Sequence, residues 1–441
     1  MPRHARFALF SLTVASLALV AAAPASLPID PGQAQAVFAE AKAISDRDGG
    51  RFWGQPLYGP ILLVAPESRA TVANRADPGG VLTAAGPLFT GRLPEAVNVS
   101  NSPTEWSGVR WTQLIWPLYG DEAMQHVSLA HEMYHRIQPT LGLWSESDGD
   151  NSHLDTLEGR YGLQLEWRAL AAALSAPTAE ARRAAILDAL VFRAERYRRF
   201  PGAAVQEAML ERTEGTAEYT GVRLGLATPA EQTAYALRDL SAHVSDKSFV
   251  RSFAYATGPA YGLLLDRPDP DWRHHFPPGQ RFDVLLLQDL KLTLPTALEA
   301  EARARAARYD QGGVLRTAEV KREEARQTRM AALKAKLVDG PILTVSLAHM
   351  NIQFNPSTLQ PLDGYGVVYP SLRITAPWGV IEVSNDALLD KDWKTLTVSA
   401  AHLAPGGLAG EGWTLTLNAG WAVVSDARAG DFRVEKAAAA R

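Results

Sequence analysis

The spacing of hydrophobic and polar residues changes along the chain, and each change predicts a different kind of element. Between about Asp30 and Trp116, short apolar runs such as YGPILLVAP and VRWTQLIWPL alternate with turn-forming residues, which predicts short strands and loops. Between Asp121 and about Leu265, apolar residues recur at helical spacing. Prolines separate these helical segments, at Pro139, Pro177, Pro201 and Pro229. Because proline cannot donate a hydrogen bond within a helix, these residues predict where helices end.

The remaining part of the chain divides at Pro341. Before it, EAEARARAARYD and AEVKREEARQTRMAALKAKL predict charged helices that are solvated along one side. After it, runs such as ILTVSLAHMNIQF and WTLTLNAGWAVV, separated by turn residues, predict a β-sandwich or barrel-like unit. We therefore expect an α+β fold. A small N-terminal β-containing part (26–120) precedes a mostly helical part (121–294), a charged helical connector (295–340) and a C-terminal β-rich domain (341–436).

Composition limits the classes of protein to which the chain can belong. Its 441 residues suffice for two domains with a large core, and 46% hydrophobic and 21% charged residues are typical of a globular protein. The formal charge of −4 lacks the basic excess that a nucleic-acid partner requires. The chain has no cysteine, which excludes disulfides, thiolate metal ligands and a cysteine nucleophile.

The N-terminus has the pattern of a secretory signal. Arg3 and Arg6 precede an apolar run from Phe7 to Ala23, and Ala23 and Ala25 form an A-x-A cleavage arrangement. We expect residues 1–25 to be removed and the mature protein to be periplasmic or extracellular, without stable membrane insertion. The alternative is an uncleaved anchor, because the run is nearly long enough to span a bilayer.

The sequence HEMYH at residues 131–135 is the strongest chemical signal in the chain. Asp121 can cap the helix that contains it, and Pro139 can end that helix. Histidines four residues apart share one helix face, so His131 and His135 can bind one ion together. Imidazole pairs of this kind suit zinc, and we expect one zinc ion per chain. The alternative is that both histidines are ordinary surface or core residues.

Glu132 has the residue type that hydrolysis at such a site requires. It follows the first histidine and would lie beside the metal rather than on it. A catalytic zinc keeps one position for water and lowers the pKa of that water. A neighbouring carboxylate can accept the proton of the water and pass it to the leaving amine. Glu132 is therefore our candidate general base.

With these residues the chain resembles the zincin metallopeptidases. The preceding run VRWTQLIWPL is similar to the edge strand that binds the substrate backbone in that family. No third histidine follows in an HExxHxxGxxH pattern, because Gln138 and PTLGLW come next. The resemblance therefore points to the gluzincin branch, in which a glutamate on a later helix is the third ligand.

Two glutamates compete for the role of third ligand. Glu214 in TEGTAEY resembles the ligand of the NEGFAEY-type motif, and Glu218 one turn later would hold a ligand histidine from behind. Glu158 in LDTLEGRYG has the more usual spacing from His135, but position 162 is glycine and offers no such partner. We favour Glu214. The alternative is a solvated acidic stripe formed by Glu207, Glu211, Glu214 and Glu218.

The resemblance also implies a tyrosine that stabilises the oxyanion. Tyr255 precedes Gly258 in FAYATGPAYG much as that tyrosine precedes a glycine in the aminopeptidases, and Tyr261 is the second candidate. The expected function is hydrolysis of a peptide or protein substrate by a zinc metallopeptidase. Two alternatives remain: an exported binding or scaffold protein with a degenerate zincin domain, and a zinc hydrolase of non-peptide amides or esters.

Overall fold

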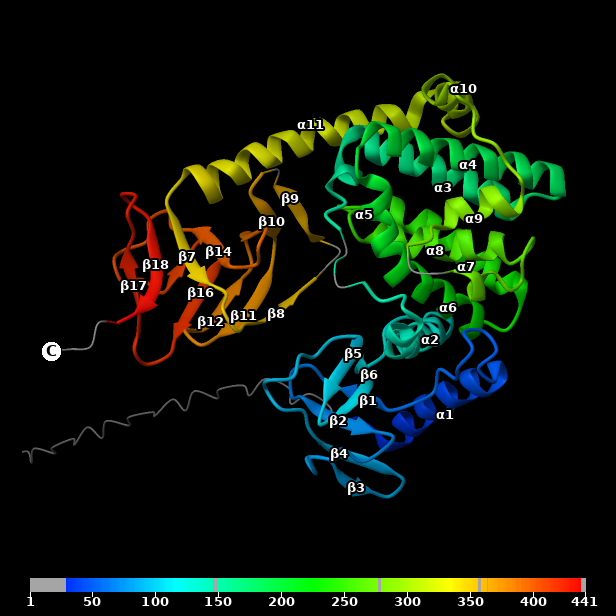
Figure 1. The fold of residues 1–441 in the computed structure, drawn as a ribbon. Helices are drawn as coiled ribbons and strands as arrows, with labels where there is room; N and C mark the ends of the chain where they lie inside the picture. Colours follow the sequence, from blue (N-terminus) through cyan, green and yellow to red (C-terminus); the bar gives the residue numbers. More distant parts are fainter. Residues whose placement is uncertain are drawn as a thin grey trace, which may run out of the picture.

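Helices and three β-sheets form the part of the chain that the computed structural model describes, which is residues 29–145, 147, 149–276, 279–355, 358–362 and 364–437 (Figure 1). The fold is mixed α+β with a β-rich C-terminal region, as the sequence pattern predicts. The predicted signal segment, residues 1–25, lies outside the described residues. Among the described helices, none combines the length and apolar character that a membrane span requires.

The described chain begins with a helix that the sequence analysis missed. Helix α1 (Pro31–Asp48) starts at the N-cap Asp30, whose side chain accepts a hydrogen bond from the backbone N–H of Gln33. Its buried face includes Ala34, Phe38, Ala41 and Ile44. The expectation of strands and loops from Asp30 onward is therefore wrong for this segment, although the helical spacing of these four residues is present in the sequence.

A six-stranded sheet follows α1. Its strands are β1 (Ile61–Val64), β2 (Ala70–Ala73), β3 (Thr83–Ala85), β4 (Leu88–Arg92), β5 (Ser102–Trp106) and β6 (Val109–Ile115). The spatial order is β3-β4-β2-β1-β6-β5, with β1 and β6 parallel and the other pairs antiparallel. The run VRWTQLIWPL thus forms the interior strand β6, whose central residues are all buried, and the edge strand next to it is β5. The sequence-based choice of edge strand is therefore corrected from β6 to β5.

The helical part agrees with the pattern of apolar residues and prolines. Its helices are α2 (Glu122–Ile137), α3 (Leu157–Ser175), α4 (Ala179–Arg199), α5 (Ala203–Leu210), α6 (Thr216–Gly225), α7 (Pro229–Ala242), α8 (Ser252–Leu265) and α9 (Phe282–Asp289). Short single turns are η1 (Gln138–Leu141), η2 (Ser152–Asp155), η4 (His243–Ser245) and η5 (Trp272–His275). A turn of π-helix, η3 (Glu211–Gly215), joins α5 to α6 into one continuous helical rod.

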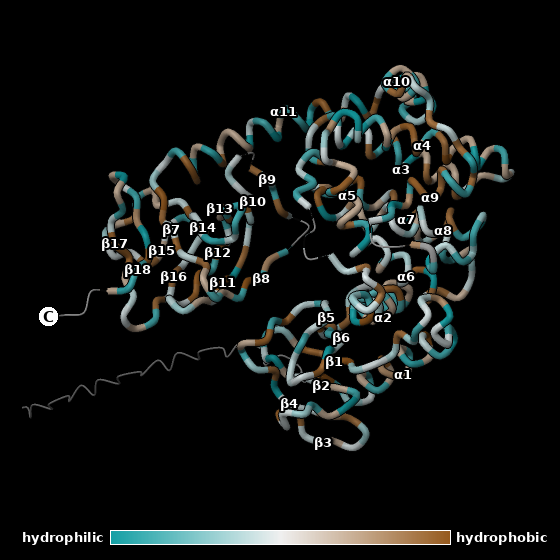
Figure 2. Tube along the Cα trace, in the orientation of Figure 1, coloured by the Kyte–Doolittle hydropathy of each residue, from teal (hydrophilic) through white to brown (hydrophobic). Residues whose placement is uncertain are grey.

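The connector is helical, as predicted, and it packs against both of its neighbours. Helices α10 (Leu298–Tyr309) and α11 (Val314–Lys334) are followed by the single turns η6 (Gln311–Gly313) and η7 (Ala335–Asp339), respectively. Hydrophilic and hydrophobic segments alternate along α11 in Figure 2. Asp188 of α4 accepts hydrogen bonds from Arg308 and Tyr309 of α10. Leu333 and Leu337 pack against apolar residues of the C-terminal strands, so the connector contacts both lobes.

Two sheets packed face to face form the C-terminal lobe. The seven-stranded sheet has the order β17-β18-β7-β14-β13-β10-β9 and the five-stranded sheet the order β15-β16-β12-β11-β8. Their strands are β7 (Ile342–Ser346), β8 (Asn351–Phe354), β9 (Gln360–Leu362), β10 (Gly366–Tyr369), β11 (Leu372–Ala376), β12 (Gly379–Val383), β13 (Ala387–Asp390), β14 (Thr395–Ser399), β15 (Ala409–Gly410), β16 (Trp413–Leu417), β17 (Trp421–Ser425) and β18 (Phe432–Lys436). Residues of both sheets, such as Leu389 and Ile381, share one core, which makes the unit a sandwich.

Glycines bring α6 unusually close to α2. A Cβ atom added at Gly221 would lie 2.6 Å from the backbone oxygen of Val127, and one at Gly225 would lie 2.7 Å from that of His126. Both distances are shorter than a methyl group tolerates, so only glycine permits this separation of the two helices. The contact sets the distance between the HEMYH helix and the helix that carries Glu218.

We expect Gly221→Ala to lower the free energy of unfolding by about 1–3 kcal/mol, because the added methyl group forces two packed backbones apart. Gly162→Ala is the matched control, since Gly162 lies within α3 and an added Cβ there has no neighbour within 4 Å. The control should be neutral or more stable by up to about 1 kcal/mol, because alanine favours the helix. Urea unfolding of both purified variants measures the difference. Equal stabilities of the two variants would contradict the close contact.

Candidate metal centre

His131 and His135 project together from the buried side of α2. The helix starts at Asp121, whose side chain accepts a hydrogen bond from the Met124 backbone, as the sequence predicts. Both histidines are only 5% exposed, and their Nε2 atoms lie 2.9 Å apart. The four-residue spacing therefore places two imidazole nitrogens at one point, as predicted.

Glu214 reaches the same point from η3. Its Oε2 lies 3.6 Å from Nε2 of His131 and 3.4 Å from Nε2 of His135. The three ligand atoms form a group that can hold a metal ion. A π-turn inserts one extra residue into a helix and is often found at functional sites. Here it lies within the rod from α5 to α6, where it includes Glu214.

The Nδ1 atom of each histidine, on the far side of the ring from Glu214, forms a hydrogen bond with a side-chain oxygen. Nδ1 of His131 lies 2.7 Å from Oε2 of Glu218, as expected for a carboxylate one turn after Glu214. Nδ1 of His135 lies 2.8 Å from Oε1 of Gln138. The Gln138 amide donates from Nε2 to the backbone oxygens of Arg212 and Thr213, so its oxygen must face His135. Both Nδ1 atoms therefore carry hydrogen, and both Nε2 atoms face Glu214, where each has a free lone pair only when its ring is neutral.

The convergence of these acceptors requires a positive charge between them. Burial opposes protonation of His131, but hydrogen bonds with Glu214 and Glu218 hold its pKa well above the usual value. Burial likewise opposes ionisation of Glu214, yet hydrogen bonds with His131 and His135 hold its pKa well below the usual value. A proton or a metal cation can supply the positive charge, so metal binding must displace the proton.

Glu132 lies beside this group, and one of its two carboxylate oxygens is unsatisfied. It is buried, and among the described residues its Oε2 has no hydrogen-bond partner. Burial raises the pKa of Glu132, and the neighbouring His131 and His135 act in the opposite direction. A buried carboxylate oxygen without a partner is costly in a protein interior, which makes Glu132 a candidate for contact with a water or a substrate.

Tyr255 and Arg251 of the α8 region bind the carboxylate of Glu214. The hydroxyl of Tyr255 donates to Oε2 at 2.7 Å, and its ring stacks on His131 with the ring centres 5.9 Å apart. Nη2 of Arg251 donates to Oε1 at 3.2 Å. Burial raises the pKa of Tyr255 well above its usual value, so the hydroxyl stays protonated and can donate a hydrogen bond.

The helix face that carries Glu214 is not a solvated acidic stripe. Glu207 and Glu211 are buried, and each forms a two-point ion pair with an arginine of α4. Arg196 binds Glu207 at 2.8 and 2.7 Å, and Arg193 binds Glu211 at 3.0 and 2.6 Å. These pairs are structural, because an unpaired buried charge would strongly destabilise the fold. They fix the rod within α5 and at the first residue of the π-turn.

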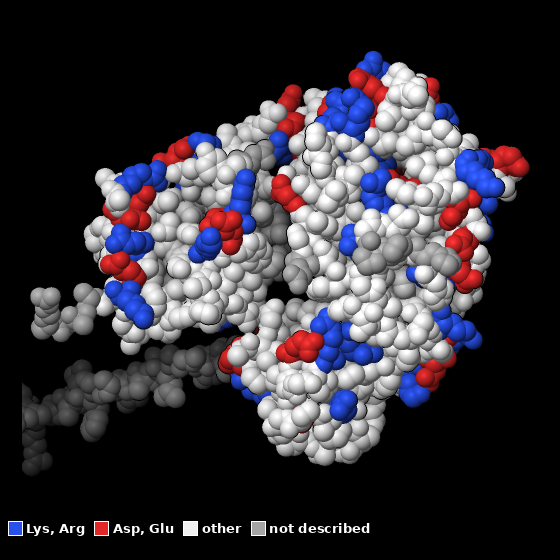
Figure 3. Space-filling view, viewed as in Figure 1, with Lys and Arg blue, Asp and Glu red and all other residues white. Residues whose placement is uncertain are grey.

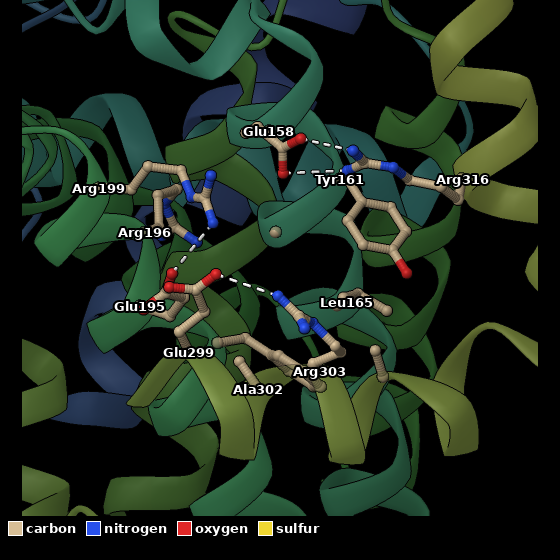
Figure 4. Close-up of a pocket in the computed structure, with 13 residues that line it drawn as sticks. Glu158, Tyr161, Leu165, Glu195, Arg196, Arg199, Glu299, Ala302, Arg303 and Arg316 are labelled. Carbon is tan, nitrogen blue, oxygen red and sulfur yellow. Dashed lines mark hydrogen bonds and ion pairs between the residues drawn. The ribbon is translucent and has the colours of Figure 1, made fainter. Parts of the chain in front are cut away.

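The two other sequence candidates bind elsewhere. Glu158 forms a two-point ion pair with Arg316 of α11 at 3.0 and 2.5 Å. Figure 4 shows this pair at the edge of a cavity of about 470 Å³ that α3, α4, α10 and α11 line. The hydroxyl of Tyr261 donates to Glu166 within the buried arginine network. The structure therefore brings Glu214 and Tyr255 to the histidines, and gives Glu158 and Tyr261 other partners.

Sequence reasoning missed three residues of the centre. Gln138 lies three positions after His135, a spacing that places it on the same helix face, so the signal was present. Arg251 and Trp144 carried no such signal, because loops deliver them. Trp144 contacts His135 edge-on at 6.0 Å between ring centres, and it is 39% exposed. It therefore lies between the buried histidines and solvent.

We expect Glu214→Gln to lower affinity for zinc far more than Glu158→Gln, because only Glu214 shares the point where the histidine nitrogens meet. Gln138→Ala and Glu218→Ala should each weaken affinity by about 10–100-fold, since they orient the ligand rings. Chelator competition on folded variants gives the order. Loss of zinc from Glu158→Gln, with Glu214→Gln binding as wild type does, would overturn the assignment.

Asp239 of α7 should make stability depend on pH. Burial, with repulsion from Glu218, raises the pKa of Asp239 from 3.8 to about 8. The folded state then binds a proton that the unfolded state has lost, so this carboxyl destabilises the protein as pH rises between these values. Asp239→Asn removes the effect. Relative to wild type, the metal-free variant should gain at least about 1 kcal/mol between about pH 5 and about pH 8 in urea unfolding.

The exposed Asp392 provides the control for this pH effect. Asp392→Asn should give the same stability difference from wild type at both pH values. A stability difference for Asp239→Asn that does not change with pH would contradict a raised pKa at Asp239.

Comparisons of the chain with known protein families, with curated proteins and with solved structures find no match. The interpretation of the centre therefore depends on the geometry of the residues themselves.

Proposed function

We propose that the protein is a zinc-dependent hydrolase that cleaves peptide bonds. The proposal depends on one observation above all: the ligand atoms of His131, His135 and Glu214 converge beside Glu132, whose buried Oε2 has no hydrogen-bond partner among the described residues. A structural metal site has no use for such a carboxylate, whereas hydrolysis requires a base at this place.

The donor set and its dimensions favour zinc. Two imidazole nitrogens and one carboxylate oxygen suit zinc, whereas magnesium and calcium prefer oxygen ligands. Ligands at 2.0–2.1 Å around a tetrahedral ion lie about 3.4 Å from one another. The three separations here are 2.9, 3.4 and 3.6 Å. The residues present therefore fit a zinc ion, with one position left for water or substrate.

Zinc, when bound, would polarise the substrate carbonyl and lower the pKa of a nearby water. Glu132 would accept the proton of the attacking water and donate it to the leaving amine, a role that its raised pKa suits. Tyr255 would turn its protonated hydroxyl from Glu214 to the oxyanion as charge develops there. Glu218 and Gln138 would keep both imidazole rings in place during these steps.

A peptide is the substrate that the surroundings suit best. Strand β5 is the edge of the N-terminal sheet and packs against α2, the helix that carries both histidines. An edge strand presents unpaired backbone groups, to which an extended peptide can add as a further strand. The signal-like N-terminus suits the same proposal, because an exported enzyme meets external or periplasmic polypeptides.

We expect Glu132→Gln to keep zinc but to lose at least about 10²-fold in hydrolysis of a peptide library, because an amide cannot carry the proton. Glu122→Gln, an exposed position on the same helix, is the control and should hydrolyse as wild type does. Zinc content and cleavage products are measured on the same samples. Full activity in Glu132→Gln would refute the proposed base, and a wild type that binds zinc but cleaves no peptide would favour a binding protein.

A further inference from the structure

A cleft of about 610 Å³ lies between the helical lobe and the C-terminal sandwich. The space-filling view shows the hollow between these two lobes (Figure 3). Gly149, Asp150 and Ser152 line one wall together with the start of α8. Residues of β9, β10 and the turn after β13 line the other wall. The volume is within the range of pockets that bind ligands.

Arg251 connects this cleft to the metal centre. It lines the cleft, and its guanidinium also donates to the metal-site carboxylate of Glu214 at 3.2 Å. Arg251 also acts on the opposite wall: burial raises the pKa of Tyr369 in β10 to about 12, and the charge of Arg251 opposes this rise. A molecule in the cleft therefore lies next to a residue that contacts a ligand of the centre.

The wall on the helical side is fixed to the rod that carries Glu214. Gly149 has a φ of +72°, and a Cβ added there would lie 2.9 Å from the backbone oxygen of Gln206 in α5. The side-chain oxygen of Gln206 in turn accepts a hydrogen bond from the backbone of Asn151, which is fully buried. Helix α5 continues through η3 to Glu214, so cleft and centre share one rigid element.

The opposite wall presents a tryptophan in an unusual conformation. Trp393 is 47% exposed and has a φ of +57°, which is rare for a large side chain. The carboxylate of Asp390 holds this turn between β13 and β14 by accepting hydrogen bonds from the backbones of Lys394 and Thr395. Strained backbone that displays an exposed aromatic ring in a cleft is typical of a binding surface.

We propose that this cleft binds the polypeptide chain of the substrate where it continues past the metal centre, with Trp393 packing on a side chain of that segment. The identity of the occupant rests on the proposed function. The cleft adds a substrate preference to that function, because it favours long, unfolded polypeptides over short peptides. The titratable charges of the lining balance, with Arg251 and Lys391 against Asp150 and Asp390, so the cleft does not select a polyanion.

The test compares long and short substrates in variants of the full chain. Trp393→Asn removes the ring and keeps a residue that tolerates positive φ, whereas Trp393→Phe restores an aromatic contact. Tyr365→Ala is the matched control, because Tyr365 is an exposed aromatic of the neighbouring β9–β10 turn and faces Lys334 of α11. In the Glu132→Gln background, affinity for unfolded casein is measured by titration. In a second assay, kcat/KM is measured for the same variants with Glu132 intact, once with casein as substrate and once with a short peptide that the wild type cleaves.

Trp393→Asn should weaken casein binding by about tenfold or more and lower kcat/KM for casein to the same extent. Trp393→Phe should recover most of the loss, Tyr365→Ala should cause none, and the short peptide should be cleaved equally by all variants. Casein affinity that is unchanged in Trp393→Asn, or an equal loss on the short peptide, would overturn the proposal. Casein binding that depends on Trp393 in a protein that cleaves nothing would support the cleft and refute the hydrolase instead.

Discussion

The short distance between α2 and α6 is the constraint on which the candidate metal centre depends. Gly221 and Gly225 let the two backbones approach to a distance that any side chain would prevent. The imidazoles of α2 and the carboxylates of the facing rod are short side chains, so a wider separation would leave their atoms out of hydrogen-bond reach. A glycine also permits close approach where α8 crosses the π-turn, because a Cβ at Gly258 would lie 2.2 Å from the backbone oxygen of Gly215. That second contact brings Tyr255 to Glu214.

Buried ion pairs fix the position of the helical rod from α5 to α6, which these glycines bring close to α2. Arg193 and Arg196 are completely buried on α4 and bind Glu166, Glu207 and Glu211. Such pairs contribute little net stability, but breaking one leaves an uncompensated charge, which is strongly unfavourable. Their effect here is geometric. Glu211 is the first residue of the π-turn that contains Glu214, so a displacement of Glu214 would also displace the buried ion pair of Glu211. The position of Glu214 is thus fixed from the N-terminal end of the π-turn.

The sequence predicted the parts of this arrangement that depend on local periodicity. The HEMYH spacing, the cap at Asp121, the proline boundaries and the β-rich C-terminal region all follow from short-range rules. The choice of Glu214 over Glu158 needed the pair with Glu218, because spacing alone favoured the other residue. What remained hidden depends on contacts between distant segments. Glu207 and Glu211 looked solvated because nothing local reveals Arg193 and Arg196, and the edge strand was misassigned because strand order is not a local property.

The electrostatics of the centre favour a positive charge among its side chains, which a proton or a metal ion can supply. Gln138 and Glu218 orient both imidazole Nε2 atoms inward, so the folded protein gathers atoms whose lone pairs repel one another unless a proton or a metal cation lies between them. A metal ion at this point would relieve the repulsion, so metal affinity and folding stability would be linked. Arg251 adds a second effect, because its hydrogen bond draws charge from the carboxylate of Glu214. A ligand that donates less charge would leave a bound cation more electrophilic, as the proposed hydrolysis would require.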